Sequence, residues 1–497
     1  MKLSQVLENS GLALTGPDPD ITAIVNDSRL AVPGALFFAL PGAKTDGANF
    51  TEQALQKGAA AVISTAEAPA HLRAAFPGAV LLNTEDLPAV LSKAAANFYG
   101  QPSRRLKVFG ITGTKGKTTT AYVLENILRL AGSRPGLLGT IDYRVDGRVL
   151  APAANTTPLA HTLQEMLAKM VSADALAAVM EVSSHALALG RAEDVDFDCA
   201  VFTNLQRDHL DFHKDRESYF QAKARLFDLL ERSPKREKCA VINADDERAG
   251  WLLKRLKGKV KAVTFALENS ADFRAVSPEV LGDQTRFTLK TAEGALPVKL
   301  RLLGRHNIYN ALAAIAAAAS AGVPLRAAVE GAEALENVPG RLERVEAGQD
   351  FKVFVDYAHT DAALESVLSN LGLMPHNRII TVFGCGGDRD RTKRAPMGEV
   401  ACALSDLAIV TSDNPRSEDP LAIIDDISKG MVDKFTNFEV IPDRGHAIEK
   451  AVQQAHTGDI LLIAGKGHET YQILKDRTVH FSDAETAAAA IKKKLGL

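Results

Sequence analysis

The stretch from Leu106 to Gly132 constrains the fold of this chain more than any other. Leu106–Ile111 has the apolar pattern of a buried strand, and the turn Gly113-Thr114-Lys115-Gly116-Lys117-Thr118-Thr119 follows it. Apolar residues from Val123 to Ala131 then recur at helical spacing, and Gly132 ends that pattern. The sequence therefore predicts a strand, a glycine-rich turn and a helix in direct succession.

This turn has the chemistry of a nucleoside triphosphate site. Glycines without Cβ allow backbone N–H groups to curl around an anion, and a helix N-terminus adds partial positive charge. Lys117 and Thr118 supply an ammonium and a hydroxyl that can reach phosphate oxygens and Mg²⁺. The usual spacing G-x-x-x-x-G-K-[ST] is not met, because Ile111 stands where the first glycine would be. We predict a variant P-loop, and a chance glycine turn is the alternative.

Length and composition limit the class of protein. A chain of 497 residues is too long for one hydrophobic core and suggests about three domains. The formal net charge of −3 gives no reason to expect a nucleic-acid partner. The four cysteines lie far apart without a C-x-x-C pair, which favours a reducing compartment over a disulfide scaffold. No run is long enough to cross a bilayer, and the N-terminus carries a charge too early for a secretion signal, so we expect a cytoplasmic protein.

Strands and helices alternate along the whole chain, which predicts α/β domains with parallel sheets. Turn-forming residues near Gly100 and Pro339 interrupt this alternation and mark two boundaries. The predicted domains are a small N-terminal α/β domain (1–101), a central P-loop domain with a doubly wound sheet (102–337) and a C-terminal Rossmann-like α/β domain (338–497).

Polar residues follow two predicted strands of the central domain, where parallel sheets usually bind ligands. Glu181 ends one strand and is placed to hold a Mg²⁺ that bridges nucleotide phosphates, with a helix cap as the alternative. Asp208–His213 follows the strand at 199–204. His209 and His213 are four residues apart, so a zinc site, a phosphate-linked site and a plain polar turn all remain open for this segment.

Four polar loops follow strands of the C-terminal domain and should share one edge of its sheet. Within them, positive charge is concentrated on one predicted rim, which suits a carboxylate or phosphate ligand. Asp413, Arg416 and Glu469 together can hold both the ammonium and the carboxylate of an amino acid, whereas solvated turns are the alternative. The rim comprises Arg389, Arg391, Lys393, Arg394 and Arg416.

Six motifs of this chain resemble those of the Mur ligases, in the family order and almost from end to end. They are Gly113 to Thr119, Asn155-Thr156-Thr157-Pro158, Glu181 to His185, Asp208 to His213, Asp356-Tyr357-Ala358-His359 and Asp413-Asn414-Pro415-Arg416. The chain is most similar to members that add meso-diaminopimelate to a UDP-N-acetylmuramoyl dipeptide in cytoplasmic peptidoglycan synthesis. The resemblance thus implies an ATP-dependent, amide-bond-forming ligase that uses Mg²⁺ and works as a monomer.

The resemblance also implies a role for each matching residue. The ATP-binding set is Gly113, Thr114, Lys115, Gly116, Lys117, Thr118, Thr119, Asn307, Arg341 and Asp356. The catalytic set is Lys117, Glu181, His209 and Lys223, and the metal set is Thr118, Glu181, His209 and Lys223, the last as a carbamate formed with CO₂. The UDP-substrate set is Ser28, Asn155, Thr156, Thr157, Ser183 and Arg191. The diaminopimelate set is Arg389, Asp413, Asn414, Pro415, Arg416, Gly465 and Glu469.

The implied reaction forms an acyl phosphate on the D-glutamyl γ-carboxylate, which the amine of diaminopimelate then attacks. Arg416 should favour diaminopimelate over L-lysine, because lysine lacks a second carboxylate. The chain departs from the family pattern at Leu189, where glutamine is frequent, and after His359, where Asp361 follows Thr360 without an intervening proline. The rival hypotheses are a lysine-adding or folylpolyglutamate synthase-like ligase and, from another class, a non-catalytic nucleotide-regulated binding protein.

Overall fold

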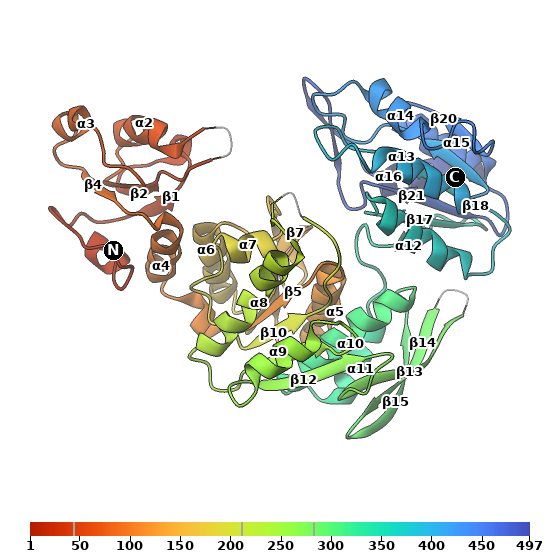
Figure 1. Cartoon of the computed structure of the whole chain (residues 1–497), viewed down its shortest axis with the longest axis horizontal. Coiled ribbons are helices and arrows are strands. Elements are labelled where there is room, and N and C mark those ends of the chain that lie inside the picture. The colour runs from red at the N-terminus through yellow and green to blue at the C-terminus, as the bar shows by residue number, and fades with distance from the viewer. Residues whose placement is uncertain (43–44, 210–211, 282–283) are drawn as a thin grey trace. The chain divides into compact units, whose positions relative to one another are not determined.

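The computed structural model in Figure 1 describes residues 1–42, 45–209, 212–281 and 284–497. Internal contacts divide the chain into two units. The first unit combines Met1–Arg274 with Tyr309–Ala332, and the second combines Ala275–Ile308 with Glu333–Leu497. Each unit is described by itself below.

The first unit begins with a small parallel sheet in the order β1-β2-β3-β4. Successive residues of β2 face opposite sides of this sheet, so Phe37 and Phe38 belong to two separate apolar clusters. This parallel sheet with its helices agrees with the small α/β domain predicted for the region. The elements are α1 (Leu3–Val6), β1 (Ala23–Val25), β2 (Ala35–Phe38), α2 (Thr51–Gln56), β3 (Ala61–Ser64), α3 (Ala70–Ala75), β4 (Val80–Asn83) and α4 (Leu87–Phe98).

The central sheet of the first unit has the order β12-β11-β10-β5-β9-β6-β7-β8. The strands from β12 to β6 run parallel, which confirms the doubly wound α/β fold, whereas β7 and β8 form an antiparallel edge that was not predicted. Its strands are β5 (Lys107–Thr112), β6 (Pro135–Leu138), β7 (Asp142–Val145), β8 (Arg148–Pro152), β9 (Ala177–Glu181), β10 (Cys199–Phe202), β11 (Cys239–Asn243) and β12 (Lys261–Ala266).

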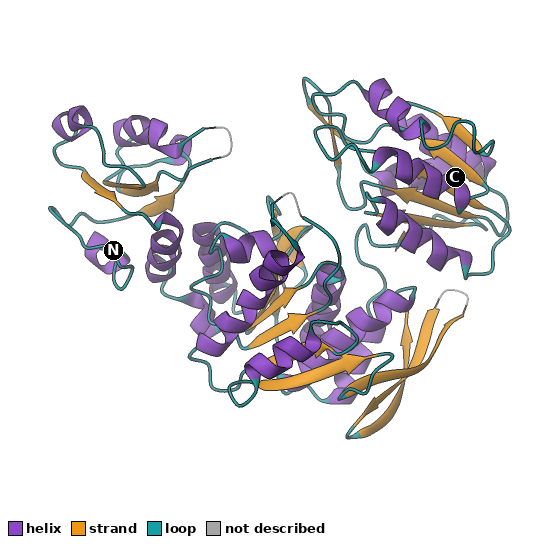
Figure 2. Cartoon of the chain, in the orientation of Figure 1, coloured by secondary structure: helices purple, strands orange, loops and turns teal. Residues whose placement is uncertain are grey.

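Helices connect the strands of this central sheet, as Figure 2 shows by colour. They are α5 (Lys117–Leu130), α6 (Ala160–Ser172), α7 (Ser184–Ala188), α8 (Arg216–Arg232) and α9 (Ala249–Leu256). Two further helices, α10 (Arg305–Ser320) and α11 (Leu325–Glu333), come later in the chain and contribute Tyr309–Ala332 to the first unit. Because β5 lies between β9 and β10, the carboxyl ends of these three strands are neighbours. The chain segments that follow them are therefore brought together at one edge of the sheet.

The second unit contains a sheet in the order β16-β17-β21-β18-β19-β20, of which all strands but β16 run parallel. Its two faces carry separate apolar clusters, with Leu364, Met397 and Ile424 from three helices on one side and Ile448 and Ile491 from two helices on the other. The elements are β16 (Glu343–Arg344), β17 (Lys352–Asp356), α12 (Asp361–Gly372), β18 (Ile379–Phe383), α13 (Arg394–Ala403), β19 (Leu407–Val410), α14 (Pro420–Ser428), β20 (Phe438–Val440), α15 (Arg444–Gln454), β21 (Ile460–Ala464) and α16 (Asp483–Leu495).

Antiparallel strands add to the second unit. The hairpin of β14 (Gln284–Thr291) and β15 (Gly294–Leu300) belongs to it, as does a short ribbon of β22 (Tyr471–Ile473) and β23 (Thr478–His480). The strand β13 (Phe273–Leu281) begins in the first unit, where Phe273 pairs with Phe265 of β12.

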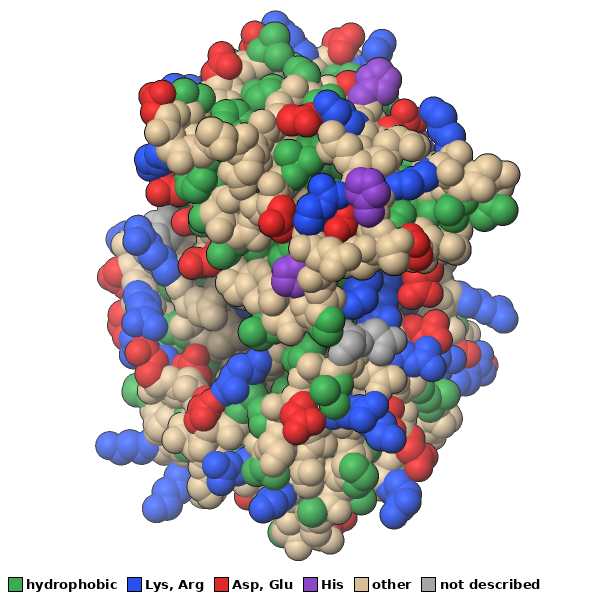
Figure 3. Space-filling model, turned by 90° about the vertical axis from the view of Figure 1, so that its right-hand side faces the viewer, with side chains coloured by type: hydrophobic (Ala, Val, Ile, Leu, Met, Phe, Trp, Pro, Cys, Tyr) green, Lys and Arg blue, Asp and Glu red, His purple; other side chains and the backbone are tan. Residues whose placement is uncertain are grey.

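The surface carries mixed charges. On the face that Figure 3 shows, Lys and Arg side chains alternate with Asp and Glu side chains, in line with the net charge of −3. The four cysteines are buried free thiols. Among the described residues, no helix combines the length and apolar character that crossing a membrane requires.

Candidate functional site

The glycine-rich turn joins the end of β5 at Thr112 to the start of α5 at Lys117. Gly113 has a φ of 151° and Gly116 a φ of 87°, both in the region that favours glycine. A Cβ at Gly113 would lie 1.9 Å from Thr203 Oγ1, and one at Gly116 would lie 2.3 Å from Asn310 Oδ1. Close neighbours as well as backbone conformation therefore require glycine at both positions.

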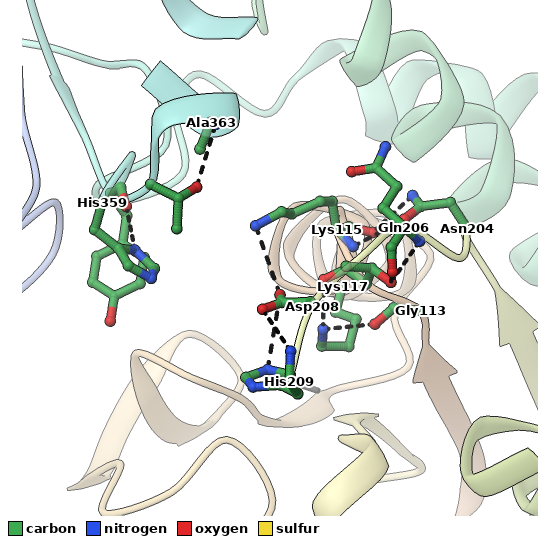
Figure 4. Close-up of polar contacts among 12 residues, drawn as sticks. Gly113, Lys115, Lys117, Asn204, Gln206, Asp208, His209, His359 and Ala363 are labelled. Atoms are coloured by element: carbon green, nitrogen blue, oxygen red, sulfur yellow. Dashed lines mark hydrogen bonds and ion pairs between the residues drawn. The ribbon is translucent and has the colours of Figure 1, made fainter. Parts of the chain in front are cut away.

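The segment after β10 holds the turn in shape. The Thr114 N–H donates to Asn204 O at 2.9 Å, and the Lys115 N–H donates to Asn204 Oδ1 at 3.0 Å. The Gln206 N–H donates to Thr114 Oγ1 at 2.9 Å (Figure 4). Asn204 and Gln206 were not predicted to be functional, although their position after β10, the strand next to β5, is the signal that could have identified them.

Lys117 folds back over this turn. Its Nζ donates to Gly113 O at 2.8 Å and to Thr114 O at 3.1 Å (Figure 4). The side chain is partly exposed, so it can exchange these carbonyl oxygens for phosphate oxygens at little cost. Thr119 follows on α5 and is buried.

Glu181 ends β9 with only 1% of its surface exposed. Its carboxylate accepts hydrogen bonds from Thr118 Oγ1 at 2.9 Å, from the Thr140 N–H at 2.8 Å and from Thr140 Oγ1 at 3.1 Å. A hydroxyl and a carboxylate side by side are the hard oxygen donors that Mg²⁺ prefers, so these residues fit a magnesium ion at the phosphates. The cap of α7 is Ser183, which accepts from the Ala186 N–H, so the alternative of Glu181 as a helix cap is wrong.

Four of the residues in the predicted UDP-substrate set gather beside Glu181. Thr157 Oγ1 donates to Glu181 O at 2.8 Å and accepts from the Ser183 N–H at 3.0 Å. Thr156 Oγ1 lies 3.1 Å from Thr140 Oγ1, which also contacts the Glu181 carboxylate. Arg191 Nη1 donates to Thr157 O at 2.9 Å. Thr140, which links two of these groups, was missed because only its proximity in space marks it.

The guanidinium of Arg191 has a hydrogen-bond donor that the described residues of this group do not satisfy. Its Nε is buried and has no hydrogen-bond partner among the described residues, and burial lowers the pKa of its guanidinium. Asn155 is exposed, and its carbonyl oxygen accepts from Tyr143 Oη at 2.8 Å. Ser28 lies in the small N-terminal sheet region, where its Oγ donates to Gln53 Oε1 at 2.5 Å.

Aromatic rings surround the predicted histidine segment. The ring of His209 lies 4.9 Å from that of His185 and 6.2 Å from that of Tyr219, while His213 Nε2 lies 3.0 Å from Ser184 Oγ. Leu210 and Asp211 of the predicted motif are outside the described residues. Within residues 1–42, 45–209, 212–281 and 284–497, no three or more His, Cys, Asp and Glu side chains are grouped to hold a metal ion.

Lys223 of α8 lies against the P-loop, 1% exposed. Its Nζ donates to Gly113 O at 2.8 Å and stands 4.3 Å from the centre of the Tyr219 ring. Burial, and next the charge of Lys117, lower the pKa of Lys223 well below its usual value. This lysine, which the helix pattern alone would leave in solvent, is therefore a buried amine with a weakened hold on its proton.

Of the predicted ATP-binding residues in the second unit, Arg341 precedes β16 and Asp356 is the last residue of β17. Asp356 accepts from the Leu342 N–H at 2.7 Å and from the Ala358 N–H at 2.8 Å, which fixes its carboxylate. The guanidinium of Arg341 lies 4.9 Å from the centre of the Tyr357 ring.

Two further residues, Thr360 and Asn307, lie near the starts of helices α12 and α10. Thr360 accepts from the Ala363 N–H at 3.3 Å and caps α12, so this helix begins directly at Asp361 (Figure 4). Asn307 is buried on α10, and its Nδ2 donates to Leu303 O at 2.8 Å.

The predicted diaminopimelate set converges at the carboxyl edge of the second sheet. Asn414 Nδ2 donates to Glu469 Oε2 at 2.8 Å, and Arg416 Nη1 donates to Gly387 O at 2.7 Å. A Cβ at Gly465 would lie 2.8 Å from Asp413 Oδ2. These loops thus bring two carboxylates, of Asp413 and Glu469, and the guanidinium of Arg416 together in one cluster. Pro415 is buried in the same loop, and Arg389 is exposed, with Nη1 donating to Asp388 O at 3.1 Å.

The predicted positive rim is wrong at one position. Arg394 is only 1% exposed and pairs with Glu418 at 2.9 Å and with Asp426 at 3.0 Å. Arg391 also pairs with Glu418, at 3.0 Å. Two acidic residues that lie 24 and 32 positions downstream in the sequence therefore neutralise charge that the local pattern assigned to the rim.

Comparisons with known proteins agree with this arrangement. Family models match residues 20–99 (Mur ligase family, catalytic domain), 111–318 (Mur ligase middle domain) and 340–467 (Mur ligase, glutamate ligase domain). The UDP-N-acetylmuramoyl-L-alanyl-D-glutamate--2,6-diaminopimelate ligase of Solibacter usitatus is 45% identical over 473 residues, 95% of this chain and 94% of its own length. The protein of that name in Bacillus licheniformis is 44% identical over 492 residues, 99% of this chain and 98% of its own.

Solved structures extend the match to the fold. A structure of a UDP-N-acetylmuramoyl-L-alanyl-D-glutamate--2,6-diaminopimelate ligase covers 100% of this chain and 99% of its own, with a TM-score of 0.70 and 33% identity. A MurF structure from Acinetobacter baumannii, at 21% identity and a TM-score of 0.65, covers 93% of this chain and 94% of its own and shares the fold. The resemblance seen in the sequence motifs is confirmed over nearly the whole length. The chain belongs to the Mur ligase family.

Proposed function

We propose that this chain is the ATP-dependent ligase that adds meso-diaminopimelate to UDP-N-acetylmuramoyl-L-alanyl-D-glutamate. The observation that carries the proposal is the pair of sites, a P-loop beside a buried Glu181–Thr118 pair and an amino-acid pocket with charges of both signs. The names of relatives at 44 to 45% identity support the same reaction. We further propose that the enzyme acts in the cytoplasm as a monomer, without nucleic-acid or membrane partners.

The proposed reaction proceeds in two steps. The γ-carboxylate of the D-glutamyl residue attacks the γ-phosphorus of ATP, which releases ADP and leaves an acyl phosphate. The neutral amine of diaminopimelate then attacks the acyl carbon, and the tetrahedral adduct loses inorganic phosphate and a proton to give the amide.

Residues of the P-loop position and screen the phosphates in this scheme. The backbone N–H groups at the start of α5, from Lys117 to Thr119, would bind the phosphates, and Lys117 would transfer its side-chain hydrogen bonds from the loop carbonyls to phosphate oxygens. Thr118, Glu181 and His209 would hold Mg²⁺, which supplies positive charge against the phosphates when bound. Arg191, with its buried unpaired Nε, would bind the UDP-substrate.

Phosphate release tests this proposal directly. The purified protein is incubated with ATP, Mg²⁺ and the UDP-muramoyl dipeptide, and diaminopimelate, L-lysine or glutamate is added in turn. We expect phosphate release with diaminopimelate, and little with the other two. Equal release with lysine would favour a lysine-adding ligase, and ATP binding without amino-acid-dependent release would favour a nucleotide-regulated binding protein.

We also propose that Lys223 carries a carbamate. A neutral amine adds CO₂ and loses a proton, which converts the ammonium into a carboxylate-like group able to sit beside Mg²⁺. An ordinary lysine with a pKa of about 10.4 is almost fully protonated at neutral pH, whereas the lowered pKa of Lys223 leaves more neutral amine. The carbamate fraction should therefore rise as pH rises through the lowered pKa.

The carbamate is measured by ¹³C NMR after equilibration with ¹³C-labelled CO₂. We expect a carbamate signal in the wild type that grows with pH and is lost in Lys223→Met. A signal that persists in the variant, or a wild type without one at any pH tested, would contradict this assignment.

A further inference from the structure

Lys466 is a fully buried lysine in the amino-acid pocket that the motif comparison left without a role. It lies in the loop after β21, between Gly465 and Gly467, and 0% of its surface is exposed. Burial of an ammonium group is costly unless opposite charges and hydrogen bonds compensate it. A lysine held in such a place needs specific partners.

The partners of Lys466 are the polar residues of the pocket itself. Its Nζ lies 3.2 Å from Asn414 Oδ1, 3.3 Å from Glu469 Oε2 and 3.9 Å from Asp413 Oδ1. Its Nζ also stands 5.7 Å from the centre of the Tyr471 ring. One ammonium group thus joins the loop after β19 to the loop after β21.

Lys466 fixes the orientation of Asn414. The amide oxygen of Asn414 accepts from Lys466 Nζ and from the Ile473 N–H at 2.9 Å. With both donors on Oδ1, the amide nitrogen must point the other way, and it donates to Glu469 Oε2 at 2.8 Å. Glu469 therefore receives hydrogen bonds from Lys466 directly and through the Asn414 amide.

Lys466 also balances charge in the pocket. Asp413 and Glu469 place two carboxylates in the cluster, and Lys466 contacts both. The buried Arg444 is paired with Asp483 at 2.7 Å, and Arg416 donates to the carbonyl oxygens of Gly387 and Asn414. Without Lys466 the pocket would hold excess negative charge at the place where a substrate carboxylate must enter.

We infer that Lys466 is a positioning residue, which holds Asn414 and Glu469 in place. In this arrangement they can bind the end of an amino acid that carries both an ammonium and a carboxylate group. The inference rests on the proposed diaminopimelate ligase function. L-lysine presents only an ammonium at the corresponding end, so it does not depend on this charge balance. Loss of Lys466 should thus weaken the binding of diaminopimelate and leave the use of L-lysine as a substrate unaffected.

The test compares Lys466→Met with the control Lys494→Met. Lys494 is another lysine of the second unit, which donates to the carbonyl oxygens of Val452 at 2.9 Å and Gln453 at 3.2 Å near the end of α15. For Lys466→Met we expect KM for diaminopimelate to rise about tenfold or more, with KM for ATP changed less than about threefold. The low kcat/KM for L-lysine should stay within about threefold of wild type, and Lys494→Met should leave all three constants near wild type.

Each outcome decides the inference. A folded Lys466→Met that loses activity with diaminopimelate and lysine in the same proportion, or that keeps the wild-type ratio, would overturn it, because a purely structural role affects both amino acids alike. If the variant does not fold, as judged by its melting temperature, Lys466→Gln replaces it with the same expectation. A wild type that does not use diaminopimelate at all would instead refute the proposed function.

Discussion

The variant Lys117→Met is expected to lower kcat by about 10²- to 10³-fold. Negative charge that develops during phosphoryl transfer needs a fixed positive group, and Lys117 is the ammonium that lies on the P-loop turn. Removal of one preorganised donor at such a position typically costs about 2.7–4 kcal/mol. Because Lys117 is partly exposed at the start of α5, the fold should remain intact.

Diaminopimelate-dependent phosphate release and the melting temperature are measured together for this variant. Lys169→Met serves as the control, because Lys169 forms an exposed pair with Glu165 on α6 and such pairs contribute little. The control should keep wild-type kcat. A folded Lys117→Met with kcat within about threefold of wild type would show that this ammonium does not screen the reacting phosphate.

Replacement of Arg416 by alanine should change the choice of amino acid. The hydrogen bonds described for its guanidinium both start at Nη1, so Nε and Nη2 would be the donors for a ligand carboxylate. A lost charge-assisted hydrogen bond costs about 1.5–3 kcal/mol, so kcat/KM for diaminopimelate should fall about 10- to 150-fold. L-lysine lacks the second carboxylate and should lose little.

The ratio of kcat/KM for diaminopimelate to that for lysine is the measured quantity. Arg378→Ala is the control, because Arg378 precedes β18 at the opposite edge of the sheet and pairs with Asp459 at 2.6 Å. Wild-type protein that already uses both amino acids equally, or an unchanged ratio in Arg416→Ala, would rule out Arg416 as the selective residue.

The sequence is sufficient to predict elements whose pattern is local. β5, the P-loop and α5 follow from an apolar run, glycines and a 3.6-residue period. Glu181 could be placed at a strand end for the same reason. The domain boundaries and the role of each site residue remain predictions.

Contacts that depend on strand order could not be predicted in the same way. Thr140, Asn204 and Asn310 reach the P-loop region because β6, β10 and α10 lie near β5, and no local pattern encodes that order. Arg394 was wrongly predicted for a related reason. A run of charged residues is usually exposed to solvent, but this arginine is buried and pairs with acidic residues from a later segment of the chain. Lys466 likewise lies in a polar loop after a strand of the C-terminal domain, and only its complete burial reveals its importance.

The carbonyl oxygen of Gly113 accepts hydrogen bonds from two lysines, Lys117 and Lys223, each at 2.8 Å. Conversion of Lys223 to a carbamate would replace a positive charge next to Lys117 with a negative one and leave the Lys223 nitrogen with a single N–H to donate. The affinity of the P-loop for nucleotide and the affinity of Lys223 for CO₂ are then thermodynamically linked. If dissolved CO₂ changes the affinity for ATP by some factor, ATP must change the affinity of Lys223 for CO₂ by the same factor. The affinity of the P-loop for ATP would then depend on the concentration of dissolved CO₂.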